Sequence, residues 1–281
     1  MEKITSCSEM QQQARQWQSE QKRVGFVPTM GALHEGHLSL VKESLAHNET
    51  TVVSIFVNPA QFGPGEDFES YPRTLENDLA MLDQLGVDLL FLPSQDDFYQ
   101  DGFSTYIEPP VVANRFEGTL RKDHFRGVTT VVLKLFMLTL PTNVYFGQKD
   151  FQQCAVLSTM IDDLALPVQF HRMPIVREED GLAMSSRNRY LSESDREKAR
   201  AISAALFSAQ AAFENGEKEG CILRKIATDY LQKHGIHEID YLTIVDPRSL
   251  TEVETIVTDV VLLVAARIGT TRLLDNILLT E

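Results

Sequence analysis

The chain has 281 residues, and its 43% hydrophobic and 23% charged residues are typical of globular proteins and exclude a disordered or fibrous chain. Its 26 basic and 40 acidic residues give a formal net charge of -14. This charge disfavours nucleic acid as a partner, because the sequence shows no cluster of basic residues that could form a basic patch. Three widely spaced cysteines without C-x-x-C spacing argue against disulfides or zinc and favour a reducing cytoplasm. We find no signal-peptide pattern and no apolar run long enough for a membrane span, so neither export nor membrane insertion is expected.

Helical and strand patterns alternate through the first part of the chain. Repeated β-α-β units predict a doubly wound, Rossmann-like parallel sheet of the α/β class, which binds ligands at the carboxyl ends of its strands. In chain order, we expect a helix at 8–22, a strand at 24–27 that ends at Pro28, a helix at 33–45, a strand at 51–57, a helix at 75–85, a strand at 87–92, a helix at 128–140, a strand at 144–146 and a strand at 173–176.

The pattern changes beyond Arg177. A long alanine-rich helix at 192–213 is followed by a polar, glycine-containing link and a second helix at 221–234. Two strands are expected at 239–245 and 260–266. We therefore predict a catalytic domain over residues 1–175 and a smaller α+β domain over residues 176–281 that closes over a shared cleft.

The segment from Pro28 to His37, with the sequence PTMGALHEGH, follows a predicted strand and begins a predicted helix. A helix N-terminus presents free N–H groups and a partial positive charge, so a triphosphate can bind there, and Gly31 and Gly36 allow its close approach. His34 and His37 are three residues apart, which predicts that they share one helical face and point to the same anion. The alternatives are two ordinary surface histidines or a metal site. The zinc-protease spacing is absent.

The H-x-G-H spacing resembles the signature of the nucleotidylyltransferase superfamily. Five further blocks, in the same order along residues 24–191, resemble the pantothenate synthetase family. They are the segments with the sequences SIFVNPAQF (54–62), YPRT (71–74), HFRGV (124–128), YFGQKDFQQ (145–153) and GLAMSSRN (181–188).

This resemblance implies an AMP-forming acid–amino-acid ligase. In that family, pantoate reacts with ATP and magnesium to give a pantoyl adenylate and pyrophosphate. The amine of β-alanine then displaces AMP and forms pantothenate. The resemblance also implies a homodimer, and it makes residues 1–175 a nucleotide- and pantoate-binding domain.

Family roles carry over to the residues that match its motifs. His34, His37 and Lys149 are the implied catalytic groups, because positioned cationic or N–H donors can stabilise the charge that develops on the phosphates. Gln61 and Gln153 match pantoate-binding glutamines, and Gln61 also lies near β-alanine in the family. The implied ATP-binding set is Met30, Gly31, Ala32, Leu33, His34, Glu35, Gly36, His37, Gly147, Gln148, Lys149, Asp150, Val176, Met184, Ser185, Ser186 and Arg187.

Magnesium could be contacted by Asp78, since this position is commonly acidic in the family, although Asn77 replaces the acid often found beside it. Three other functions are alternatives. A nucleotidyltransferase would keep the nucleotide on its product, a tRNA-charging enzyme is disfavoured by the acidic charge, and a non-catalytic nucleotide-binding protein should have lost His34, His37 and Lys149.

Overall fold

The computed structural model describes residues 1–280. The chain divides into two compact units, the first comprising residues 1–147 and 156–173 and the second residues 148–155 and 174–281. The predicted boundary near residue 175 differs from this division in one respect, because the short segment after residue 147 groups with the second unit.

The first unit contains a six-stranded parallel sheet in the order β1-β4-β3-β2-β5-β6, so the predicted doubly wound sheet is confirmed. Its strand order reverses between β2 and β5, where the carboxyl ends of parallel strands leave room for a ligand. The strands are β1 (Glu2–Ile4), β2 (Val24–Thr29), β3 (Thr50–Ile55), β4 (Leu89–Phe91), β5 (Asn143–Gly147) and β6 (Gln169–Met173).

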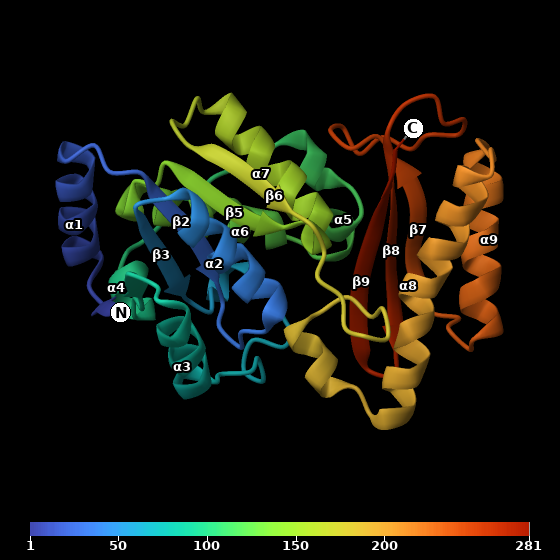
Figure 1. Cartoon of the computed structure of the whole chain (residues 1–281), viewed down its shortest axis with the longest axis horizontal. Coiled ribbons are helices and arrows are strands. Elements are labelled where there is room, and N and C mark those ends of the chain that lie inside the picture. Colours follow the sequence, from blue (N-terminus) through green and yellow to red (C-terminus); the bar gives the residue numbers. More distant parts are fainter. Residues whose placement is uncertain (281) are drawn as a thin grey trace. The chain divides into compact units, whose positions relative to one another are not determined.

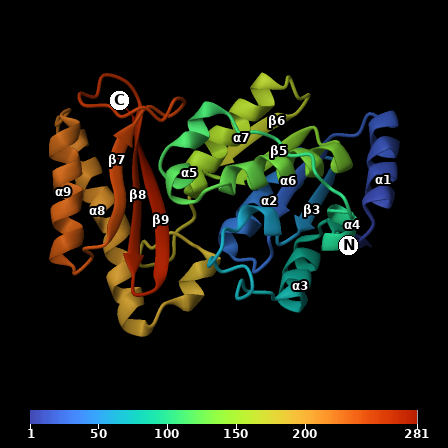
Figure 2. The same ribbon diagram turned by 180° about the vertical axis from the view of Figure 1, so that it is seen from behind.

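Helices cover both faces of this sheet (Figures 1 and 2). Val27 of β2 lies in a buried cluster with residues of α2, while the adjacent Phe26 packs on Phe136 of α6 with ring centroids 6.3 Å apart. Neighbouring strand residues point to opposite faces, so α2 (Glu35–His47) and α6 (His124–Thr139) lie on opposite sides of the sheet.

The other helices of residues 1–150 are α1 (Cys7–Ser19), α3 (Leu75–Leu85), α4 (Gln95–Phe98) and α5 (Glu117–Leu120), with 3-10 turns η1 (Pro59–Gln61), η2 (Val111–Asn114) and η3 (Gln148–Asp150).

Pro28 lies inside β2 and does not end it as predicted. A proline in a central strand normally removes a ladder hydrogen bond. Here β5 pairs only with Gly25 and Phe26, so the strand is already unpaired on that side at Pro28. Pairing with β3 continues through Pro28 and Thr29.

The second unit contains a three-stranded antiparallel sheet in the order β7-β8-β9, which matches the predicted smaller α+β part of the fold. Val260, Leu262 and Val264 of β8 alternate along one face and form a core with α8 and α9. The elements are α8 (Glu193–Glu214), α9 (Gly220–Lys233), β7 (Ile239–Val245), β8 (Val260–Ile268), β9 (Thr271–Leu279) and η4 (Ser186–Tyr190), and α7 (Phe151–Asp163) begins in this unit and ends in the first. The strand β9 was not predicted.

Candidate active site

The first group of predicted site residues lies where β2 leads into α2. His34 is the N-cap of α2 with an extended backbone (φ -148°), so it lies outside the helix, and the predicted shared helical face is wrong. Its Nδ1 atom accepts a hydrogen bond from the Gly36 N–H at 3.1 Å, which places the proton of the neutral ring on Nε2. The cap nevertheless brings the two imidazoles together, and the ring centroids of His34 and His37 are 4.1 Å apart.

The turn between β2 and α2 has an unusual backbone that requires glycine at one position. Gly31 has φ +80°, and a Cβ there would lie 3.0 Å from the Ile55 side chain and 3.1 Å from Asp78 Oδ2. Thr29 supports the turn because its hydroxyl accepts from the Gly31 N–H at 3.1 Å and donates to the Ser54 carbonyl at 2.8 Å. The glycine of the motif therefore serves both the turn and the close approach of Asp78.

The carboxylate of Asp78 binds the backbone of this turn. Its side chain is buried, and its two oxygens accept hydrogen bonds from the N–H groups of Ala32 and Leu33, both at 2.9 Å. The Thr74 hydroxyl donates a third bond to Oδ1 at 3.1 Å. Because both carboxylate oxygens are engaged by the protein, these contacts favour a role in shaping the loop over the magnesium contact expected from the sequence.

Gln61 ends the short turn η1, beside the β2–α2 loop. Its amide nitrogen contacts Met30 Sδ at 3.2 Å, and its amide oxygen accepts from Asn58 Nδ2 at 3.0 Å. Asn58 is buried, and it also donates to the Gly127 carbonyl at 3.2 Å and accepts from the Tyr99 hydroxyl at 2.8 Å. The predicted pantoate ligand and the predicted nucleotide loop are thus neighbours, and Gln61 is held by Asn58, which was not among the predicted site residues.

A chain of polar contacts supports η1 from the other side. Arg121 makes a bidentate ion pair with Glu66, with N···O distances of 2.8 and 2.7 Å, and its Nη1 lies 3.1 Å from His124 Nε2. Arginine can only donate, so Nε2 accepts and the His124 Nδ1–H donates to the Gln61 carbonyl at 2.9 Å. Burial, together with the charge of Arg121, lowers the pKa of His124 to about 4, which keeps this histidine neutral.

In the second unit, Lys149 lies in η3, directly after β5. Its ammonium is 3.6 Å from Asp150 Oδ1, and its side chain is largely shielded whereas that of Asp150 is half exposed. Gln153, the second predicted pantoate ligand, lies in the first turn of α7 and is half-buried. Gln61 and Gln153 fall in different compact units.

The second nucleotide-binding segment of the prediction forms a narrow hairpin. The predicted strand through Val176 is wrong, because β6 ends at Met173 and the Val176 carbonyl accepts from the Met184 N–H at 3.0 Å. A bridge between Arg177 and Ala183 completes the hairpin. Ser185 then caps η4, since its hydroxyl accepts from the Arg187 N–H at 3.3 Å.

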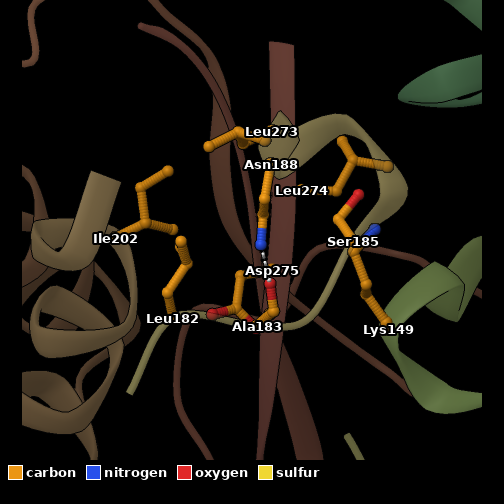
Figure 3. Close-up of a pocket in the computed structure, with 9 residues that line it drawn as sticks. All are labelled: Lys149, Leu182, Ala183, Ser185, Asn188, Ile202, Leu273, Leu274 and Asp275. Atoms are coloured by element: carbon orange, nitrogen blue, oxygen red, sulfur yellow. Dashed lines mark hydrogen bonds between the residues drawn. The ribbon is translucent and has the colours of Figure 1, made fainter. Parts of the chain in front are cut away.

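Lys149 and Ser185 line one pocket of this unit, with about 210 Å³ of empty space that includes the open mouth (Figure 3). Asn188 also lines it and donates to the Ala183 carbonyl at 3.1 Å and to Glu178 at 3.0 Å. A buried aspartate, Asp275 of β9, forms part of the same wall. Lys149 and Ser185 were predicted site residues, whereas Asp275, a polar residue within an apolar strand, was missed together with β9.

Metal binding and membrane insertion each require a particular arrangement of residues. Within residues 1–280, no group of three histidine, cysteine, aspartate or glutamate side chains is arranged to hold a metal ion. None of the helices in the same range is long and apolar enough to cross a membrane.

Cys7 and Cys154 are buried, as expected for small apolar residues, whereas Cys221 is exposed.

Comparison with known proteins places these features in a family. A family model described as pantoate-beta-alanine ligase matches residues 2–278. The pantothenate synthetase of Herpetosiphon aurantiacus is 48% identical over 280 residues, covering 99% of this chain and 100% of the relative. The pantothenate synthetase of Thermosipho africanus is 48% identical over 279 residues, again with 99% and 100% coverage.

Solved structures agree with the sequence relatives. Pantothenate synthetase from Thermus thermophilus superposes with a TM-score of 0.94 at 41% identity, and the match covers 100% of both chains. Pantoate-beta-alanine ligase from Francisella tularensis, complexed with beta-gamma ATP and beta-alanine, superposes with a TM-score of 0.81 at 34% identity over 99% of this chain and 97% of that chain.

Proposed function

The chain belongs to the pantoate-beta-alanine ligase family, and we propose that this ligase joins pantoate to β-alanine in two steps that consume ATP. In the first step, a pantoate carboxylate oxygen attacks the α-phosphorus of ATP, and the bond to the leaving pyrophosphate breaks. In the second step, the β-alanine nitrogen attacks the acyl carbon, the bond to AMP breaks, and pantothenate is released. The adenylate between the two steps conserves the energy of ATP in a reactive acyl group.

The observation that carries this proposal is the pair of imidazoles at the N-terminus of α2, with ring centroids 4.1 Å apart after a central parallel strand. A helix N-terminus favours phosphate through its free N–H groups and its dipole. The tautomer of His34 presents Nε2–H as a second kind of donor. Such an arrangement suits the negative charge that builds on the phosphates during adenylation.

We assign His37, His34 and Lys149 to stabilisation of that charge. Lys149 supports the assignment because it lines a pocket that Ser185 also lines. The nucleotide would contact the β2–α2 loop, the segment from Gly147 to Asp150, and the hairpin. In this arrangement the Asp150 carboxylate accepts from a ribose hydroxyl, and the proposed contacts in the hairpin come from Val176, Met184, Ser185, Ser186 and Arg187.

Pantoate is proposed to bind through the amides of Gln61 and Gln153, which can bond its hydroxyl and carboxylate oxygens without adding charge. Gln61 supports this role because its amide nitrogen lies next to Met30 of the nucleotide loop. An acid bound there would lie close to the phosphates it must attack. The same glutamine is proposed to contact β-alanine in the second step.

Magnesium accompanies ATP in the proposed reaction, but Asp78 does not fit a direct ligand, since its oxygens already accept three hydrogen bonds. Mg²⁺ commonly binds phosphate oxygens and water with few protein carboxylates. We therefore assign no protein ligand to the ion and no step to Asp78 beyond support of the loop. A homodimer is proposed from the family resemblance, and a cytoplasmic location from three widely spaced cysteines without C-x-x-C spacing.

The test is exchange of labelled pyrophosphate into ATP, with each substrate omitted in turn. We expect exchange that requires pantoate and AMP release that requires β-alanine. His37→Ala should slow exchange by about 100-fold, because it removes a positioned donor. His47→Ala, which removes an exposed histidine at the other end of α2, is the matched control. A product that keeps its nucleotide when β-alanine is added would indicate a nucleotidyltransferase.

A further inference from the structure

Two polar side chains lie buried in the middle of β9, between apolar neighbours. Asp275 is 4% exposed and Asn276 is 1% exposed, and both follow Leu273 and Leu274 in the strand. Burial of an amide or a carboxylate is unfavourable unless its hydrogen bonds are replaced inside the protein. The partners of both side chains lie in the two segments of this unit that are proposed to bind nucleotide.

Asn276 bonds the segment that carries Lys149. Its Nδ2 atom donates to the carbonyl oxygens of Gln148 at 2.9 Å and of Lys149 at 3.0 Å. Its Oδ1 atom accepts from Gln148 Nε2 at 3.2 Å. Both amide protons and the amide oxygen are therefore directed at two consecutive residues, which fixes the peptide planes on both sides of the Lys149 Cα atom.

Asp275 bonds the hairpin through Arg177. The guanidinium of Arg177 donates to both carboxylate oxygens, at 2.6 and 3.0 Å, and to the Gly181 carbonyl at 3.2 Å inside the hairpin. Removal of either charge would leave the other buried without its partner. The ion pair therefore ties the base and the tip of the hairpin to the centre of β9.

The two contacts start from adjacent residues of one well-supported strand. Asp275 pairs in register with Val264 and Asn276 with Leu263, and β9 is paired with β8 along its whole length. Adjacent strand residues point to opposite faces, so the two segments are held from opposite sides of β9. A fixed strand thus sets the position of one segment relative to the other.

We propose that Asn276 is a positioning residue for Lys149 and that Asp275, through Arg177, positions the hairpin that leads to Ser185. The inference rests on the proposed function, since it gives a catalytic purpose to bonds that would otherwise only satisfy buried groups. Lys149 ends in a flexible side chain, so its ammonium can be held near a phosphate only if its backbone is fixed first. Donors placed before reaction need no reorganisation as charge develops.

The experiment compares wild type, Asn276→Ala and a control, Asp240→Asn, in the full chain. Asp240 of β7 pairs with Arg267 at 3.8 Å and Arg272 at 2.5 Å in the same sheet, but neither arginine belongs to a proposed nucleotide-binding segment. Two quantities are measured: kcat/KM for ATP in pantoate-dependent exchange, and amide hydrogen exchange of residues 147–153 and of β8 without substrates.

We expect Asn276→Ala to lower kcat/KM for ATP by about 10-fold to 100-fold, as loss of alignment commonly does. Amide exchange should accelerate at residues 147–153, while β8 stays as protected as in wild type and Asp240→Asn changes neither quantity. The positioning role would be overturned if Asn276→Ala had the same kcat/KM for ATP and the same amide hydrogen exchange at residues 147–153 as the wild type.

If Asn276→Ala does not fold, Asn276→Ser, which keeps one hydrogen-bonding group, is measured in its place. Loss of β8 protection in this variant too would overturn the proposal, because Asn276 would then serve the sheet alone. A wild-type chain without pantoate-dependent exchange contradicts the proposed function. If the wild type shows normal pantoate-dependent pyrophosphate exchange and the variant shows the same, only the role of Asn276 is contradicted.

Discussion

The Nδ1 atom of His124 lies 2.9 Å from the carbonyl oxygen of Gln61, and this contact connects a partly buried ion pair to a proposed substrate ligand. On its other side, His124 accepts from Arg121, which is held by Glu66. The neutral imidazole is thus the only protonation state that can donate to Gln61 and accept from Arg121 at once. The contacts of His124 with Gln61 in η1 and with Arg121 therefore need that state.

The first prediction concerns pH and His124. Burial and Arg121 lower its pKa in the folded protein to about 4 from 6.5, against the opposing charges of Glu66 and Glu117. The unfolded chain therefore binds a proton first as pH falls. Above pH 6.5 the free energy of unfolding keeps its full value with respect to His124. Between about pH 6.5 and 4 it falls by on the order of 3 kcal/mol.

Urea unfolding of wild type and His124→Gln at several pH values tests this. The free energy of unfolding of the variant should vary less with pH in that window. A His237→Gln control removes an exposed imidazole from the second unit. Parallel pH profiles for wild type and His124→Gln would show that His124 does not govern acid sensitivity.

The second prediction concerns Gly127 in the first turns of α6. An added Cβ would lie 2.1 Å from the Ala60 carbonyl oxygen and 2.6 Å from the Gln61 nitrogen. Replacing glycine by alanine normally favours a helix by about 1 kcal/mol. Here the overlap with backbone should outweigh that gain and lower the free energy of unfolding by roughly 1 to 3 kcal/mol.

The KM for pantoate should rise in Gly127→Ala as well, because η1 must move. Gly147→Ala is the control for stability, since nothing beyond its two chain neighbours lies within 4 Å of its added Cβ. Equal stability of Gly127→Ala and wild type, measured by denaturant unfolding, would mean that η1 is free to shift.

The third prediction concerns Asp78. Asp78→Ala removes the acceptor of two backbone N–H groups in the β2–α2 loop and should destabilise the protein by about 3 kcal/mol. The KM for ATP should rise even at saturating magnesium, because the loop loses its shape. Asp83→Ala on the same helix removes an exposed carboxylate and is the control. Unchanged stability with a raised magnesium requirement would instead identify Asp78 as a metal contact.

The fourth prediction concerns substrate binding by the two glutamines. Gln61→Ala and Gln153→Ala should each raise the KM for pantoate by about 10-fold, as loss of a hydrogen bond in a binding site does, and change the KM for ATP less. Steady-state kinetics with each substrate varied in turn provide the measurement. Gln18→Ala, on the exposed face of α1, is the control. Equal changes in both KM values would indicate a general disturbance of the site.

Features set by neighbouring residues were predictable from the sequence. The apolar spacing of 75–85 predicted α3 with its observed bounds, and that of 239–245 did the same for β7. The alternation of such elements led to the parallel sheet. The motif residues His34 and His37 were correctly expected to lie together, because a cap and a first turn are local structures.

Contacts between distant segments decided the rest. The end of β6 at Met173, where its pairing with β5 stops, and the bonds of Asp78 to the Ala32 and Leu33 N–H groups depend on backbone partners elsewhere in the fold. Asp275 and Asn276 look like interruptions of an apolar strand in the sequence, and only the tertiary structure supplies their partners 98 and 127 residues away. Apolar periodicity follows from the chain alone, whereas a buried polar group is understood only once its hydrogen-bond partner is known.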